Sequence, residues 1–385
     1  MQELVKRSIL SQIQQRLATN PAVALLGPRQ CGKTTLARSM GGVYFDLELE
    51  TDQIKLDAQW GTLVNAQKTI ILDEAQAMPS IFPRLRAEID RDRQRKGRFL
   101  LLGSVAPAMM HQVSESLAGR LALVELSPFV WDEVKDHLLD DLWFYGGYPD
   151  GGILDKQQYL QWQQDYLSLI TQRDLPQWGL PAKPMTTFKL FRMIAALHGQ
   201  NWNASRMGQA MGLNHQTVTS YLEYTTGCYL IRILEPYTAN LRKRLVKSPK
   251  VYWRDSGLLH ALMQIRTIDD LFTQPWVGAS WEGFVIEQII NHLHAQGQVF
   301  TPYYLRTSDQ YEIDLLLDYG SHCCAIEVKL TSCPSLDMVK RFNKAADLID
   351  AQQRILVCRI PEPLAGDHVT ITHLPGALDI LLSLA

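Results

Sequence analysis

The sequence lacks several features that would place it in a class at first sight. Its six cysteines show no C-x-x-C spacing, which argues against structural zinc and favours a reducing compartment. No uncharged apolar run reaches the ~18 residues that a membrane-spanning helix needs. The amphipathic N-terminus has no apolar signal core. These absences predict a cytoplasmic protein without a membrane segment.

Charge and composition exclude two further classes. The formal net charge is −2, so no general basic field predicts nucleic-acid binding, and any such site must be a local patch. Apolar residues make up 46% of the 385 residues, which excludes a disordered chain and allows two or three domains with their own cores. The chain contains no internal repeat and no low-complexity segment.

The order of apolar runs predicts an α/β fold with four parts. Residues 1–127 alternate short apolar runs with helical patterns, which indicates a parallel sheet with helices on its faces. Residues 128–184 are expected to form a helical lid, broken by GGYPDGG at 146–152. Residues 185–255 predict helices followed by a β-rich stretch, and residues 256–385 return to a mixed α/β pattern.

The segment GPRQCGKT fits the phosphate-binding pattern G-x-x-x-x-G-K-[ST] and lies between a predicted strand and a predicted helix. Its glycines let backbone N–H groups point at phosphate. Lys33 is expected to reach the β- and γ-phosphates of ATP, and the Thr34 hydroxyl to bind Mg²⁺. The predicted nucleotide-binding residues are Gly27, Pro28, Arg29, Gln30, Cys31, Gly32, Lys33, Thr34 and Thr35.

A second motif, TIILDEAQ at 69–76, is a buried strand that ends in two acids. Ligands bind at the carboxyl edge of such sheets. Asp73 is expected to hold the Mg²⁺ shell, and Glu74 to orient or deprotonate the attacking water. The alternative is a strand that ends in a solvated acidic turn.

Three residues near the motifs allow more than one interpretation each. Ser104, at the tip of RFLLLGS, could position water or cap the next helix. Arg120 could contact the γ-phosphate within its own chain, act on a neighbouring subunit of a homo-oligomer as an arginine finger, or form a surface ion pair. Cys31 could be a reactive thiolate beside Lys33, or only a small residue at a variable position.

Residues 201–237 predict a helix-turn-helix followed by a strand, as in a winged helix. The exposed face of the second helix would carry His215, Gln216, Thr219 and Ser220, none of which is the basic residue that usually reads guanine. A basic run follows, and residues 201–254 are therefore a candidate DNA contact. The alternative is that this part only packs domains together. The run contains Arg232, Arg242, Lys243, Arg244, Lys247, Lys250 and Arg254.

Near the C-terminus, strand alternation in YEIDLLLD and CAIEVKL predicts a hairpin with one polar face. Asp314 and Glu327 would then meet as a carboxylate pair with Lys329 beside them, and Glu282 on an upstream helix could join them. Such oxygen ligands suit Mg²⁺, and a lysine can polarise a water molecule. The alternative is an ion-pair cluster without activity.

These segments together resemble the AAA+ ATPases, and more narrowly a family of prokaryotic AAA-type ATPases with a C-terminal domain of unknown function. The resemblance is carried by GPRQCGKT, ILDEAQ, LLGSVAP, ESLAGRLALVELSPF, YGGYPDGG, KRLVKSPKVYWRDSGLL and the EID…IEVK pair. It implies ATP hydrolysis by Lys33, Thr34, Asp73 and Glu74, a winged helix-turn-helix and a restriction-endonuclease-like C-terminal core. Arg173 matches a recurring family position without an assigned role.

We therefore expect an ATP-binding and ATP-hydrolysing AAA+ protein associated with nucleic acid, in which the C-terminal domain is a candidate Mg²⁺-dependent nuclease. The alternative is a regulatory ATPase that acts on a protein partner, with the C-terminal fold as an inactive docking module. The near-neutral charge and the weak recognition helix motivate the alternative.

Overall fold

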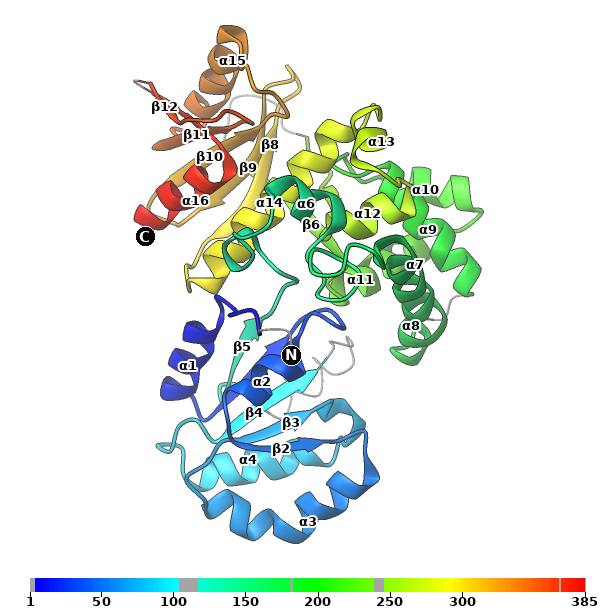
Figure 1. Cartoon of the computed structure of the whole chain (residues 1–385), viewed down its shortest axis with the longest axis vertical. Helices are drawn as coiled ribbons and strands as arrows, with labels where there is room; N and C mark the ends of the chain where they lie inside the picture. The colour runs from blue at the N-terminus through cyan, green and yellow to red at the C-terminus, as the bar shows by residue number, and fades with distance from the viewer. Residues whose placement is uncertain (1–3, 104–116, 181–182, 239–245, 367, 385) are drawn as a thin grey trace.

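The computed structural model describes residues 4–103, 117–180, 183–238, 246–366 and 368–384. Two sheets lie at opposite ends of the molecule, and a group of helices lies beside the second sheet (Figure 1). Among the described residues, no helix is long and apolar enough to cross a membrane. The strands are β1 Ala22–Leu26, β2 Val43–Asp46, β3 Ile70–Asp73, β4 Phe99–Gly103, β5 Leu121–Glu125, β6 Ile231–Pro236, β7 Lys250–Trp253, β8 Thr301–Arg306, β9 Glu312–Asp318, β10 Cys323–Val328, β11 Gln353–Val357, β12 Leu364–Ala365 and β13 Thr370–Thr372.

The helices follow the same order along the chain. They are α1 Leu10–Thr19, α2 Lys33–Ser39, α3 Glu50–Asn65, η1 Ala75–Ala77, α4 Ile81–Arg91, η2 Trp131–Glu133, α6 Leu139–Tyr145, α7 Tyr159–Leu169, η3 Ile170–Asp174, α8 Leu175–Gln177, α9 Pro184–Ala196, α10 Ala204–Met211, α11 His215–Gly227, α12 Ser256–Leu262, α13 Ile268–Phe272, α14 Val277–Ala295, α15 Leu336–Asp347 and α16 Leu374–Ser383.

The first sheet is parallel, in the order β2-β3-β4-β1-β5, and its strands are the five apolar runs of the N-terminal part. Ala22 pairs with Leu121 in a parallel register, so the carboxyl ends of the strands lie at one edge. Ala24 packs with α3 and α4, whereas Val23 and Leu25 pack with α1 and α2. A sheet buried on both faces explains the continuous apolar runs and confirms the predicted α/β fold of this part.

The predicted GGYPDGG break lies between α6 and α7, where the chain passes close to another segment. Gly146 has φ of 81°, and a Cβ at this position would lie 2.3 Å from the carboxylate of Asp255. The backbone N–H of Gly147 donates to Asp255 Oδ2 over 2.8 Å. Glycine is therefore required here to bring α6 against the start of α12.

The second sheet crosses the domain boundary that we expected after residue 255. It has eight strands in the order β12-β13-β11-β10-β9-β8-β6-β7. The β6–β7 pair, expected to belong to the helix-turn-helix part, joins it because Glu235 and Pro236 pair with Tyr303 and Tyr304 of β8. The β-rich stretch and the C-terminal part thus share one mixed sheet.

A buried ion-pair network joins the two sheets. Arg254, which follows β7, donates through Nε to Glu287 Oε2 of α14 over 3.1 Å and also pairs with Glu125 at the end of β5. Arg232 of β6 donates through Nη2 to the same Glu287 oxygen over 3.0 Å. Burial alone would raise the pKa of Glu287, but the two guanidinium groups lower it. The network therefore holds a charged carboxylate in the protein interior.

Glu287→Gln is expected to lower the free energy of unfolding by about 3–5 kcal/mol, because two buried guanidinium groups lose their shared counter-charge. The expected readout is a lower urea midpoint, followed by circular dichroism. Glu362→Gln, at an exposed position, is the matched control and should leave the midpoint unchanged. Equal midpoints for Glu287→Gln and the wild type would contradict a stabilising role for the network.

Candidate functional site

The P-loop connects β1 to α2 and folds around the Lys33 ammonium. Lys33 Nζ donates to the carbonyl oxygens of Gly27 over 3.0 Å and Pro28 over 2.7 Å, and the residue is 8% exposed. Gly27 has φ of 151°, and a Cβ there would lie 2.1 Å from the carbonyl oxygen of Leu126. Gly32, with φ of 99°, directly precedes α2. The loop thus has the curled backbone that the sequence predicts, with the lysine on its inner side.

The two residues predicted to hold Mg²⁺ lie side by side. Thr34 Oγ1 donates to Asp73 Oδ2 over 2.6 Å, although the residues are far apart in sequence. The Tyr44 hydroxyl donates to the same oxygen over 2.7 Å. Burial, with the hydrogen bond to Asp73, raises the pKa of Tyr44 and keeps it a donor. A hydroxyl and a carboxylate oxygen suit Mg²⁺, so these residues fit the metal that the motif implies.

Glu74 directly follows β3 and has an uncommon backbone conformation. Its φ is 46°, in the left-handed region, which is a strained position for a residue other than glycine. Gln76 donates a side-chain hydrogen bond to the Glu74 carboxylate. Burial raises the pKa of Glu74, and this exceeds the opposing effects of Gln76 and Lys33. A carboxylate with a raised pKa is a better proton acceptor, as a general base requires.

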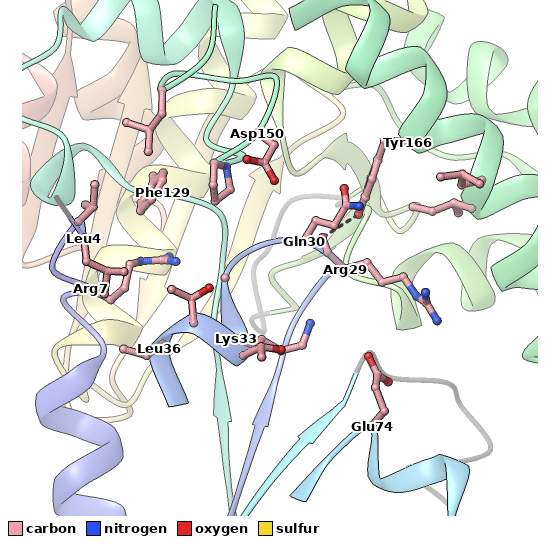
Figure 2. Close-up of a pocket in the computed structure, with 18 of the residues that line it drawn as sticks. Leu4, Arg7, Arg29, Gln30, Lys33, Leu36, Glu74, Phe129, Asp150 and Tyr166 are labelled. Atoms are coloured by element: carbon pink, nitrogen blue, oxygen red, sulfur yellow. Dashed lines mark hydrogen bonds between the residues drawn. The ribbon is translucent and has the colours of Figure 1, made fainter. Parts of the chain in front are cut away.

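Lys33 and Glu74 open into a cavity of about 820 Å³ between the P-loop and the helices that follow β5 (Figure 2). One wall is the P-loop and the N-terminal segment, and the other is residues 129–174. The apolar part of the lining comprises Leu4, Val5, Phe129 and Leu154, which lie apart from the polar groups at the strand tips. A cavity with an apolar side and a phosphate-binding loop suits a nucleotide.

An ion pair closes the cavity between the P-loop and the segment η3. Arg29 Nε lies 3.1 Å from Asp174 Oδ2, and Arg173 Nε lies 3.0 Å from the other oxygen of the same carboxylate. The Tyr166 hydroxyl donates to the carbonyl oxygen of Arg29 over 3.2 Å. Residues 170–174 form a π-helical turn, a feature frequent at functional sites. Arg173, which had no assigned role, thus belongs to the cavity wall.

Arg7 is a member of the site that sequence reasoning missed. Its guanidinium donates to the carbonyl oxygens of Cys31 over 2.8 Å and Ser127 over 2.6 Å, and its Nε lies 3.0 Å from Glu133. It therefore ties the P-loop to the chain that leaves β5. No motif marks Arg7, and only the buried position of a charged residue in the N-terminal segment shows its role.

Arg120 does not reach the cavity of its own chain. It precedes Leu121, which pairs with Ala22 at the amino edge of the sheet, whereas the P-loop lies at the carboxyl edge. Its guanidinium forms two hydrogen bonds of 2.9 Å to Asp90, which is the surface ion pair named as an alternative. The predicted contact of Arg120 with the γ-phosphate of its own chain was therefore wrong. Its action on a neighbouring subunit stays a prediction. Ser104 lies outside the described residues.

Cys31 is fully buried, and its Sγ faces the carbonyl oxygen of Leu126 at 3.4 Å. It does not line the cavity, whereas its neighbours Gln30 and Gly32 do. A side chain closed off from solvent has no access to reagents, so the prediction of a reactive thiolate was wrong. The structure agrees with the alternative, in which Cys31 is only a small residue of the loop.

The helix-turn-helix pattern corresponds to α10 and α11. Gly212 ends α10 in the left-handed conformation with φ of 69°, and Asn214 caps α11 by accepting from the backbone of Thr217 over 2.7 Å. His215, Gln216 and Thr219 are exposed as expected, and Ser220 is half-buried. The exposed face of α11 is thus polar and without a basic residue among these four.

Most described residues of the basic run that was expected to contact DNA are buried and form ion pairs within the protein. Arg232 and Arg254 belong to the buried network with Glu287, and Lys250 is 2% exposed. Buried guanidinium and ammonium groups cannot release counterions by neutralising phosphate. Among the described members of the run, only Lys247 is exposed, and residues 242–244 lie outside the described residues.

The C-terminal hairpin brings its predicted residues together. β9 and β10 pair in an antiparallel register, with Ile326 opposite Leu315. Lys329 Nζ lies 2.6 Å from Glu327 and 3.4 Å from Asp314. The hairpin prediction was confirmed, but strict alternation was not.

A β-bulge interrupts the pairing of β8 with β9. Tyr303 of β8 pairs with Leu316, whereas Leu305 pairs with Ile313, so the register shifts between these two pairs. As a result, Ile313 packs with Leu316 on the side of α15, whereas Leu315 packs with α14. Strict alternation along the strand would place the side chains of Ile313 and Leu315 on the same face of the sheet.

The structure adds Lys250 to this cluster, between the acids expected to bind a metal. Its ammonium lies 3.1 Å from Glu282, 2.7 Å from Glu312 and 3.7 Å from Asp314. No group of three or more His, Cys, Asp or Glu side chains in the described part of the chain is arranged to hold a metal ion. The cluster therefore does not fit the Mg²⁺ that a nuclease-like site implies.

Three family models match successive segments of the chain. Residues 19–135 match the family model of an AAA domain, and residues 136–269 and 277–376 match two domains of unknown function, DUF8612 and DUF4143. The Walker-type ATPase PABY2304 of Pyrococcus abyssi is 16% identical, with a TM-score of 0.45 over 68% of this chain and 96% of that chain.

Two mycobacterial proteins resemble the chain over nearly its whole length. "Uncharacterized protein Rv2008c" of Mycobacterium tuberculosis and "Uncharacterized protein Mb2031c" of Mycobacterium bovis are each 35% identical over 396 residues. Each alignment covers 98% of this chain and 87% of the relative. The chain therefore belongs to the family of these proteins, in which a P-loop ATPase domain of the AAA type precedes the DUF8612 and DUF4143 domains.

Proposed function

We propose that the protein binds and hydrolyses ATP in the cavity between the P-loop and residues 129–174. The observation that carries this proposal is that Lys33, Thr34 and Glu74 line one cavity, with Asp73 hydrogen-bonded to Thr34 beside it. In this proposal residues 1–127 are the AAA+ core and residues 128–184 are a lid over the nucleotide. In this proposal α10 and α11 form a helix-turn-helix, and the restriction-endonuclease-like core is the C-terminal part whose sheet also includes β6 and β7.

Each group of the site has a defined part in hydrolysis. The backbone of the P-loop and Lys33 hold the β- and γ-phosphates, and Glu74 accepts a proton from the attacking water. Thr34 and Asp73 would hold Mg²⁺, which neutralises phosphate charge when bound. The apolar lining near Phe129 and Leu154, on the other side of the cavity, suits the adenine ring of the nucleotide.

Nucleotide binding is coupled to the rest of the chain through the cavity wall. Arg29 belongs to the P-loop, and its partner Asp174 belongs to η3. A movement of the P-loop when the phosphates bind or leave would therefore shift η3 and the helices beside it. The Glu125–Arg254 pair links the sheet of the ATPase domain to the sheet of the C-terminal part in the same way. Hydrolysis would then change the angle between the two parts.

The internal use of the basic run favours a protein partner over nucleic acid. Arg232, Lys250 and Arg254 are unavailable to phosphate, and the net charge of the chain is −2. In this proposal the C-terminal sheet is a docking module without nuclease activity. The second candidate, a DNA-associated ATPase, rests on the exposed polar face of α11 with His215 and Gln216.

Phosphate release from ATP and Mg²⁺, measured with and without duplex DNA over a range of salt concentrations, tests the proposal. We expect hydrolysis that duplex DNA does not change, and no salt-dependent binding of DNA. Salt-dependent binding that is lost in the double variant His215→Ala/Gln216→Ala, together with stimulated hydrolysis, would establish the second candidate instead. Lack of phosphate release under all conditions would contradict ATP hydrolysis itself.

A further inference from the structure

The acids of the C-terminal cluster surround one ammonium group. Glu282 comes from α14 and Glu312 and Asp314 come from β9, so three carboxylates from two elements converge on Lys250 of β7. The Lys250 side chain is 3% exposed. Its shortest contact is the 2.7 Å distance from Nζ to Glu312 Oε1. Lys250 is therefore a buried cation held by carboxylates.

The backbone of β7 and a neighbouring aromatic ring hold Lys250 in this position. Its backbone pairs with Leu234 in the β6–β7 ladder and forms an isolated bridge with Asn201. Its Nζ lies 5.5 Å from the ring centre of Tyr304, whose hydroxyl donates to the carbonyl oxygen of Ser248. Because the strand and the ring both restrict it, the side chain has no free path out of the cluster.

The remaining acid of the cluster, Glu327, is paired through one oxygen: its Oε1 contacts Lys329, whereas its buried Oε2 has no hydrogen-bond partner among the described residues. Asp314 also accepts from the backbone N–H of Val328 over 2.9 Å, and the second lysine, Lys329, contacts both Asp314 and Glu327. Two ammonium groups, those of Lys250 and Lys329, thus pair with the carboxylates of this cluster.

A divalent ion and the Lys250 ammonium exclude each other. An ion bound at the usual oxygen distances of about 2.0–2.6 Å to Glu282 Oε1 and Asp314 Oδ1 would compete with Nζ for the oxygens that the ammonium contacts. In a buried site, two like charges at such a distance repel strongly because little water screens them. Only one of the two cations fits, and the one built into the fold is the lysine.

We propose that Lys250 is the resident cation of this cluster and closes it to divalent metal ions. The ammonium takes the place that a metal has in a nuclease, and it links β7 to β9 and α14 by charge. The C-terminal sheet is thereby stabilised without a metal. This inference is independent of ATP hydrolysis at the other end of the molecule.

Binding of Mn²⁺ to the nucleotide-free full chain, measured by electron paramagnetic resonance, tests the proposal. Wild type and Asp314→Asn should bind the same amount of Mn²⁺. Lys250→Met should gain one further Mn²⁺ site, which Asp314→Asn in the same chain removes. Lys340→Met, at an exposed position on α15, is the matched control and should gain none.

Wild-type Mn²⁺ binding that falls in Asp314→Asn would overturn the proposal, since the site would then be open to metal. A folded Lys250→Met protein without a new site would overturn it as well. If Lys250→Met does not fold, Lys250→Gln keeps a hydrogen-bond donor and serves in its place. The comparison of wild type with Asp314→Asn, or with Glu282→Gln, decides the point without any change at Lys250.

Discussion

Lys33→Ala should reduce phosphate release from ATP by about 10²–10³-fold and weaken ATP binding. The Lys33 ammonium is expected to bring positive charge to the β- and γ-phosphates, and loss of a single group that stabilises transition-state charge has an effect of this size. Because the ammonium lies 2.7–3.0 Å from carbonyl oxygens of the loop, its removal also leaves these acceptors without a partner. Steady-state phosphate release and equilibrium binding of a fluorescent ATP analogue measure the two effects.

The matched control for this variant is Lys55→Ala. Lys55 lies on α3 and pairs only with the i−3 residue Asp52 at the surface, so its loss should leave hydrolysis unchanged. Thermal melting of both variants shows whether the fold is retained. Wild-type turnover in a folded Lys33→Ala protein would mean that ATP is hydrolysed elsewhere or not by this loop.

Glu74→Gln should stop turnover while ATP binding persists. Glutamine has the shape of glutamate and keeps the hydrogen-bonding reach toward Gln76, but it cannot accept a proton from water. General-base catalysis contributes about 10²–10⁴-fold, so phosphate release should fall by that factor with an unchanged affinity for ATP. Quenched-flow measurement of a single turnover separates the chemical step from binding.

Glu50→Gln provides the matched control because it is an exposed glutamate in the first turn of α3. It should hydrolyse ATP at the wild-type rate. If Glu74→Gln lost ATP affinity in parallel with turnover, the carboxylate would act in binding rather than in proton transfer. Unchanged turnover would remove its proposed role.

The ATPase part could be predicted from the sequence because its signals are local. Each strand of the first sheet is a short apolar run, and the P-loop motif fixes the spacing of its glycines, lysine and threonine. Asp73 ends such a run, so its place at the carboxyl edge of the sheet, where it meets Thr34, could be inferred.

The remaining features depend on contacts between distant segments, which no local pattern encodes. Arg120 lies directly before a strand, but only sheet order shows that it lies at the wrong edge for its own nucleotide. Lys250 reads as one member of a basic run, and its burial follows from the pairing of β6 with β8. The bulge opposite Ile313 likewise breaks an alternation that looks regular in the sequence.

The shared sheet has a consequence for how such proteins diversify. Since β6 lies next to β8 and Lys250 neutralises acids of β9 and α14, a segment beginning at residue 256 would carry an unpaired strand edge and an uncompensated acidic cluster. Recombination at that point would give neither half a stable partner. The helices α9–α11 and the C-terminal sheet are therefore expected to be inherited together, as one unit of exchange.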